Sequence, residues 1–232
     1  MFDQEYEMRE AARTYLYLLF QRLFRREPDQ RLIAVLCGPV TEDSLALCLG
    51  GDSEALRDFQ PVLESLRARM ESEPDEVVDA LRDEYTRLLL GPHALPAPPW
   101  ESVYVMKDRT LFQACTLEVR KVYASYGLLS SGHPHVADDH LALELDFMHM
   151  LCERMTEAGQ KGNREGFAAY CDEQRRFLDG HLLRWTGSFA RDIGKVGGAL
   201  LYPQAAQVLG AFLQSDRALL DDESFAAEQV SA

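Results

Sequence analysis

The chain has 232 residues and a formal net charge of −14, from 24 Lys and Arg against 38 Asp and Glu. Nucleic acid and anionic membrane surfaces attract proteins with a basic footprint, so this composition excludes both as predicted partners and favours a basic one. With 47% hydrophobic residues and no segment of sustained alternating hydrophobicity, the chain is predicted to be all-α, a single globular bundle of about ten helices.

The first half of the chain shows helical periodicity. Apolar residues recur at helical spacing over residues 8–24. Pro28 ends this helix, and a short second helix is expected to end near Gly38. Thr41 is the predicted N-cap of a third helix that stops at Gly50.

A long helix is predicted over residues 52–71, with Pro61 expected to kink or divide it, and another over residues 74–90. Residues 91–99 then hold four of the ten prolines, which exclude a helix, and Trp100 follows them. Proline-rich loops with an aromatic anchor often bind ligands, although a rigid packed connection is the alternative interpretation.

Helical periodicity then continues to the last dozen residues. Asp138 and Asp139 are expected to open one helix, and Gly180 and Gly187 could divide another. The predicted segments are residues 108–126, 138–158, 165–193 and 203–220. We therefore predict one domain over residues 1–220, with a possible seam near 127–137, and a frayed tail over residues 221–232.

The sequence carries no targeting or membrane signal that we recognise. The acidic start, MFDQEYEMRE, lacks the basic and apolar regions of a signal peptide, and no apolar run reaches about 18 residues. The five cysteines are scattered and include no C-x-x-C pair, which favours reduced thiols and argues against a zinc site. These features predict a cytoplasmic protein without stable membrane insertion.

Motifs for catalysis are weak. The chain contains no G-x-S-x-G, no P-loop and no H-E-x-x-H sequence, so we expect no cofactor and no catalytic residues. His140 and Glu144 have the helical spacing of metal ligands, but His149 lies 2.5 turns on, on nearly the opposite face. A metal-dependent hydrolase using Asp139, His140 and Glu144 remains an alternative. A binding protein is favoured.

Two stretches carry a family resemblance. The first runs over residues 84–92 and continues through PAPPWESVY at residues 96–104. The second is DDHL at residues 138–141, which follows a helix containing Thr116 and Arg120. Both resemble the signature of the TorD/DmsD family, cytoplasmic chaperones for molybdenum-cofactor oxidoreductases.

The resemblance implies an all-helical chaperone, monomeric or a domain-swapped homodimer, and not an enzyme. Its partners would be an apo-molybdoenzyme of the DMSO/TMAO-reductase type and that enzyme's twin-arginine leader, held back from export until the cofactor is inserted. A chaperone for a nitrate-reductase-type client that stays in the cytoplasm, without leader binding, is the alternative.

The family's leader-binding region matches Trp100, Asp139 and His140. We expect Asp139→Ala to weaken leader binding with the fold intact, and His140 to position the leader or to make a pH-dependent contact. The same two motifs supply the other candidate binding residues, which are Pro99, Glu101, Ser102, Tyr104 and Asp138.

Two positions depart from the family pattern. Ala137 replaces a frequent proline, which puts domain swapping in doubt, and Gln113 replaces a frequent glycine, which could narrow the groove or change client preference.

Overall fold

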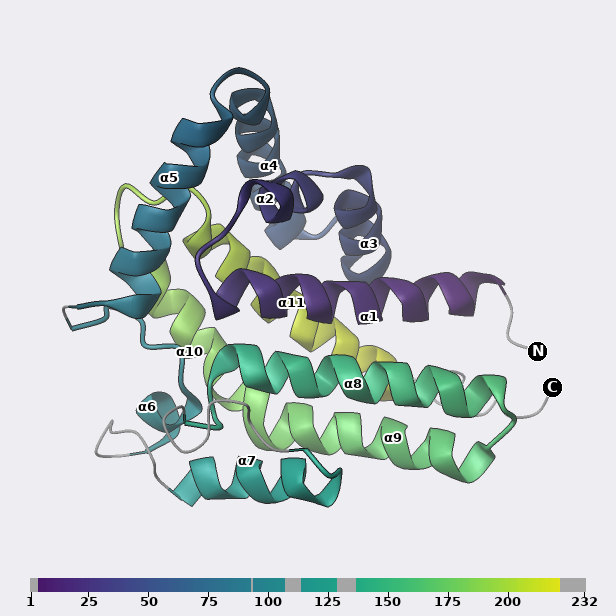
Figure 1. The fold of residues 1–232 in the computed structure, drawn as a ribbon. Coiled ribbons are helices and arrows are strands. Elements are labelled where there is room, and N and C mark those ends of the chain that lie inside the picture. Colours follow the sequence, from purple (N-terminus) through teal and green to yellow (C-terminus); the bar gives the residue numbers. More distant parts are fainter. Residues whose placement is uncertain (1–3, 93, 107–113, 129–136, 222–232) are drawn as a thin grey trace.

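The computed structural model describes residues 4–92, 94–106, 114–128 and 137–221, and its regular elements are helices (Figure 1). The predicted all-α class is therefore confirmed for the described part of the chain. In chain order the helices are α1 (Gln4–Arg25), α2 (Gln30–Leu36), α3 (Pro39–Leu49), α4 (Glu54–Ser72), α5 (Pro74–Tyr85), the π-helical turn η1 (Thr86–Leu90), α6 (Glu101–Val105), α7 (Ala114–Ser125), α8 (Leu141–Gln160), α9 (Arg164–Phe177), the π-helical turn η2 (Leu178–Leu182), α10 (Leu183–Gly194) and α11 (Tyr202–Asp221).

The helices share a hydrophobic cluster that runs from α1 to α11. Helix α8 packs between α1 and α9, while α10 packs along α11, which also contacts α3 and α4 (Figure 1). Aromatic rings tie distant elements together: Tyr17 of α1 meets Phe212 of α11 at a ring-centroid distance of 4.9 Å, and Phe24 meets Phe189 of α10 at 5.8 Å. The wide apolar face predicted for the first helix is accounted for by these contacts on several sides.

A buried polar network joins α1, α9 and α11. The guanidinium of Arg13 is fully buried and donates to Glu10 at 2.8 and 2.9 Å, to Gln174 at 2.7 Å and to Asp216. The Tyr17 hydroxyl donates to the second Asp216 oxygen at 2.6 Å. Charges this deep are tolerated only when paired and hydrogen-bonded, so these helices are fixed in one mutual register.

Boundaries in the first half follow the predictions with two corrections. Asp29 caps α2 by accepting from the Leu32 amide at 2.8 Å. Thr41 is not an N-cap, because Pro39 already occupies the first turn and the Thr41 hydroxyl donates to the Val35 carbonyl at 2.8 Å. Pro61 does not divide α4. Pro61 is exposed on the surface of α4. The carbonyl one turn earlier, which receives no hydrogen bond from the proline nitrogen, can therefore bond to water.

Two predicted helices contain π-helical turns. The segment predicted over residues 74–90 ends in η1, which closes at Gly91 with a positive φ of 96° and leads into the proline-rich loop. The segment predicted over residues 165–193 is interrupted by η2, which contains Gly180, whereas Gly187 lies inside α10. A π turn shifts helix register, and such turns are frequent at functional sites.

Several predictions fall wholly or partly outside the described residues. These are the start of the 108–126 helix, Gln113, most of the predicted seam at 127–137, and the tail after Asp221. Ala137 is described and is buried. No single described helix is long and apolar enough to cross a membrane; the bent pair α2 and α3 passes on length and composition alone.

The cysteines behave as the sequence indicates. All five are free thiols, and all but the half-buried Cys48 are buried. Burial raises the pKa of the Cys37 and Cys115 thiols to about 11, which keeps them protonated at neutral pH.

Candidate functional site

The two signature stretches meet in space at Trp100 and His140. An antiparallel bridge joins these residues. The Glu101 amide donates to the Asp139 carbonyl at 3.0 Å, and the Leu141 amide donates to the Pro99 carbonyl at 2.9 Å. The proline-rich loop and the start of α8 are therefore one structural unit, which we call the Trp100–His140 corner.

Asp139 lies inside this corner and is fully buried. One carboxylate oxygen accepts from the Ser102 amide at 2.8 Å and the other from the Thr116 hydroxyl at 2.9 Å. The carboxylate thus joins the first turn of α6 to α7, where it also complements the positive end of the short α6 helix. Asp139 is placed to hold the corner together.

Asp138 is also buried, and it binds a second side chain of α7. Its carboxylate accepts from Arg120 Nε at 2.6 Å, and its carbonyl accepts from the Tyr123 hydroxyl at 3.3 Å. Because both aspartates are taken up in these contacts, α8 does not begin at them as predicted. The helix begins at Leu141, with His140 as its N-cap.

His140 caps α8 with its ring. Its backbone is extended, and its Nδ1 accepts from the Ala142 amide at 3.1 Å. Burial lowers the pKa of the His140 imidazole to about 4, an effect that Arg25 of α1 strengthens and Asp139 opposes. The neutral ring therefore carries its proton on Nε2 at neutral pH.

Trp100 packs against this histidine and keeps part of its surface exposed. The two ring centroids are 5.2 Å apart at an interplanar angle of 82°, an edge-to-face contact. The indole Nε1 has no hydrogen-bond acceptor among the described residues. Tyr104, by contrast, stacks on the buried Trp185 at 5.5 Å, and is therefore held by packing.

The predicted site residues thus divide into two groups. Trp100, Tyr104 and His140 keep part of their surface exposed, and of these only Trp100 and His140 form the outer corner. The others are buried behind it and support it; these are Pro99, Glu101, Ser102, Asp138 and Asp139.

Two buried carboxyls behind the corner, from α6 and α8, bond to side chains of η2 and α10. Glu101 Oε2 contacts His181 Nδ1 of η2 at 2.9 Å, and Glu144 Oε2 of α8 accepts from Trp185 Nε1 at 3.0 Å. Burial, followed by the Glu101 carboxyl, raises the pKa of Glu144 well above its usual range. Burial of the Glu144 carboxyl thus favours its protonated form.

Sequence analysis did not identify His181, Trp185 and Arg184 as parts of this arrangement. Arg184 Nη1 lies 3.7 Å from Glu101 Oε1. Their only signal in the sequence is helical spacing: His181 and Trp185 are four residues apart. The π turn η2 sets the direction of these side chains, and no pattern in the sequence predicts a π turn.

A groove with both apolar and charged lining residues adjoins the proline-rich loop. It has a volume of about 530 Å³, with walls that include Leu95, Pro96, Pro98 and Val103 on one side and Val196 on the other. The ion pair between Lys195 and Asp192, at 2.7 Å, forms its polar edge. This size is within the range of small-ligand and peptide side-chain pockets.

The arrangement does not suit metal-dependent hydrolysis. Among the described residues no group of three His, Cys, Asp or Glu side chains could hold a metal ion. Asp139 and His140 are engaged in backbone contacts, and Glu144 is buried and accepts from the Trp185 indole. Asp139, His140 and Glu144, the residues of the hydrolase alternative, therefore do not form a metal site in the described structure.

The low pKa of His140 gives a testable pH dependence. The unfolded chain takes up the His140 proton near pH 6.5 and the folded chain only near pH 4, so this residue lowers stability as pH falls between those values. Urea unfolding at pH 7.5 and pH 5 should show a larger loss of stability for the wild type than for His140→Gln. Equal losses in the two proteins would contradict the assignment.

Comparisons with known proteins place the sequence among chaperone relatives. The model of the family described as "Nitrate reductase delta subunit" matches residues 52–191. "Chaperone protein TorD" of Vibrio parahaemolyticus is 26% identical over 94% of this chain and 98% of that protein, and the TorD of a Psychrobacter species is 28% identical over 95% and 96%. "Tat proofreading chaperone DmsD" of Salmonella typhi is 26% identical over 81% and 86%.

Proposed function

The chain belongs to the nitrate reductase delta subunit family, and from this premise we propose that it is a cytoplasmic chaperone for a molybdoenzyme, binding the apoenzyme and its twin-arginine leader until the cofactor is in place. The TorD and DmsD relatives confirm the family resemblance carried by the two signature stretches. Their names describe chaperones, so the protein is not expected to catalyse a reaction. Its own state is a monomer or homodimer.

The single observation that carries this proposal is the union of both signature stretches in the Trp100–His140 corner. A leader combines paired arginines with an apolar stretch. The corner offers an aromatic face, and the adjoining groove of about 530 Å³ offers apolar side chains beside the charged pair Lys195 and Asp192. The net charge of −14 favours a basic segment approaching from solution.

Trp100→Ala is the variant that tests the leader site. Loss of an aromatic anchor from an interface costs roughly 1–3 kcal/mol, or about 5- to 150-fold in affinity. We expect this weakening in calorimetric titration with the leader peptide of a DMSO/TMAO-reductase-type enzyme. Val40→Ala, which removes an apolar group exposed on α3, should leave the affinity unchanged.

A second titration tests whether the paired arginines of the leader are what the site recognises. A leader whose two arginines are replaced by alanine should bind weakly to the wild type and show little further loss with Trp100→Ala. Wild-type affinity in the Trp100→Ala protein, with the same melting temperature, would remove Trp100 from the site.

A client that stays in the cytoplasm is the second candidate. The description of the matching family, a nitrate reductase subunit, favours it. Such a chaperone would hold the apoenzyme body and have no measurable affinity for an isolated leader. Recovery of an apo-molybdoenzyme that binds equally well after its leader is removed would support this alternative.

A further inference from the structure

Two pockets lie end to end along α1. One, of about 640 Å³, is lined by the N-terminal half of α1 and the C-terminal half of α8; the other, of about 500 Å³, is lined by the C-terminal half of α1 and by α2. Tyr15 and Leu18 line both pockets. Because α2 and α8 flank α1 on opposite sides (Figure 1), the pockets form one diagonal depression, which we call the α1 groove.

The end of the α1 groove near the N-terminus of α1 is acidic. Among the described residues, its lining holds four carboxylates and no arginine or lysine. Glu10 is buried and paired within the chain, whereas Glu7, Glu153 and Glu157 are exposed. Glu7 forms no ion pair with a described residue, and the two glutamates of α8 make only surface pairs one turn along, which contribute little. Three carboxylates are thus available to basic groups from outside.

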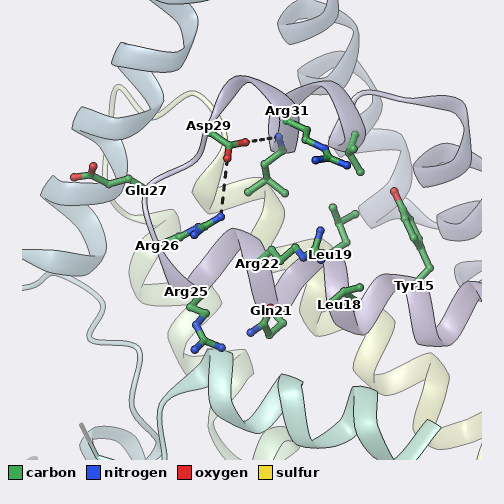
Figure 2. Close-up of a pocket in the computed structure, with 12 residues that line it drawn as sticks. Tyr15, Leu18, Leu19, Gln21, Arg22, Arg25, Arg26, Glu27, Asp29 and Arg31 are labelled. Atoms are coloured by element: carbon green, nitrogen blue, oxygen red, sulfur yellow. Dashed lines mark hydrogen bonds and ion pairs between the residues drawn. The ribbon is translucent and has the colours of Figure 1, made fainter. Parts of the chain in front are cut away.

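The other end of the α1 groove is basic. Four exposed arginines line it, and these are Arg22, Arg25, Arg26 and Arg31 (Figure 2).

Little in the described part of the chain neutralises these arginines. Arg22 and Arg31 form no ion pair with a described residue, and the other two make only surface pairs with N–O distances of 3.8 and 4.0 Å. The two carboxylates in the same lining are engaged elsewhere. Asp29 accepts from the amide at the start of α2, and Glu27 accepts from the Thr86 hydroxyl, both at 2.8 Å. This end of the α1 groove therefore attracts carboxylates.

The two charged ends point the same way. Glu7 and Arg25 are 18 residues apart, which is five turns at 3.6 residues per turn, so both side chains leave α1 on one side, about 27 Å apart. Tyr15 and Leu18 lie between them, and Val35 of α2, which is 42% exposed, adds apolar surface. The α1 groove is thus apolar in its middle and carries opposite charges at its ends.

We propose that the α1 groove is the contact surface between two copies of this chain, related by a two-fold axis that passes close to Tyr15. A half-turn about this axis sets the acidic end of each copy against the basic end of the other, so each ion pair occurs twice. Glu7 of one copy then faces Arg25 of the second. Glu153 and Glu157 of α8 face Arg31 of the second copy's α2.

The charge pattern favours a second copy over other occupants. A small anion, or a peptide with charges of one sign, would use only one end of the α1 groove. A second copy uses both ends and the apolar middle, because a strip with opposite charges at its ends is complementary to itself after a half-turn. No residue of the Trp100–His140 corner lines either pocket, so the proposal does not depend on leader binding.

The size of the α1 groove suits a weak, reversible dimer. Residues 6–26 cover about 30 Å of α1, and with the flanking faces of α2 and α8 the strip is about 20 Å wide, or roughly 600 Å² per copy. A pair buries about 1,200 Å², the lower limit of specific interfaces. Such a dimer is expected to form at tens of micromolar and to weaken with salt, because exposed ion pairs are screened.

Sedimentation of the full chain between 1 and 100 µM is the first test. In 50 mM NaCl we expect the monomer at the lowest concentration and twice its mass at the highest. In 500 mM NaCl the midpoint should rise by about tenfold. A monomer throughout, or a dimer that is indifferent to salt, would overturn the proposal.

Reversing the charges tests the pairing itself. One variant carries arginine at the acidic end, as Glu7→Arg, Glu153→Arg and Glu157→Arg. The other carries glutamate at the basic end, as Arg22→Glu, Arg25→Glu and Arg31→Glu. Each variant alone should be monomeric at 100 µM, because like charges meet at both ends, and an equimolar mixture should form a one-to-one complex. Recovery of pairing in the mixture also shows that both variants are folded.

A control variant carries the same change in net charge away from the α1 groove. Arg57→Glu, Arg176→Glu and Arg191→Glu lie at exposed positions of α4, α9 and α10, and none of them lines either pocket. This control should form a dimer at the wild-type concentration. Loss of its dimer, or failure of the two reversed variants to pair when mixed, would contradict the proposed contact.

A further titration identifies a different occupant. If the wild type stays monomeric at 100 µM while sodium tripolyphosphate binds it at micromolar concentration, and Arg22→Glu with Arg31→Glu abolishes that binding, the basic end takes a small polyanion. The proposed contact between two copies is then wrong.

Discussion

Replacing Asp216 with alanine is expected to lower the free energy of unfolding by about 3–5 kcal/mol, because it removes one of the two carboxylates bonded to the buried Arg13 guanidinium and also the acceptor of the Tyr17 hydroxyl. For a chain of this length, each kcal/mol shifts the melting temperature by roughly 2–4 °C. The loss should appear in both thermal and urea unfolding.

A matched control is the exposed ion pair that Arg217, the neighbour of Asp216 on α11, makes with Asp179 of η2. Asp179 accepts from Arg217 of α11 in two bonds of 2.8 Å, but its side chain is 53% exposed. Asp179→Ala therefore removes a similar ion pair in water, and should cost no more than about 1 kcal/mol. Similar losses for Asp216→Ala and Asp179→Ala would show that the buried network does not hold α1 to α11.

The second large effect is expected for Asp139→Ala. Removal of this carboxylate leaves the Ser102 amide and the Thr116 hydroxyl buried without their acceptor, at a cost of about 2–4 kcal/mol in unfolding free energy. The sequence-based expectation was a weaker leader contact with the fold intact. Full burial of Asp139 makes the loss of stability the primary effect.

Thr116→Val is the control for that variant, because it removes one donor and leaves the Asp139 carboxylate with the Ser102 amide. We expect a cost of about 1 kcal/mol. Leader affinity is then measured well below each melting temperature. If Asp139→Ala is as stable as the wild type and binds the leader weakly, Asp139 contacts the leader directly and the structural interpretation is wrong.

Much of the fold follows from local sequence. Helical spacing of apolar residues, prolines and capping residues predicted α1, α2, α4 and α11 to within a few residues. The errors have local causes. Thr41 and Asp138 are good capping residues by type, but tertiary contacts with the Val35 carbonyl and the Arg120 guanidinium use their oxygens instead. Capping preference is weaker than a buried hydrogen bond.

In the candidate site, too, local sequence predicts some features and tertiary contacts decide the others. The sequence by itself determined the all-helical class, the acidic surface and the family, because these depend on periodicity, composition and contiguous motifs. Only the tertiary structure decided that Trp100 and His140 form the outer corner while Asp138, Asp139 and Glu101 are buried beneath them. The π turn η2 places His181 against Glu101 and leads into α10, where Trp185 donates to Glu144. Burial and proximity between residues far apart in the chain arise from packing, and no local pattern encodes them.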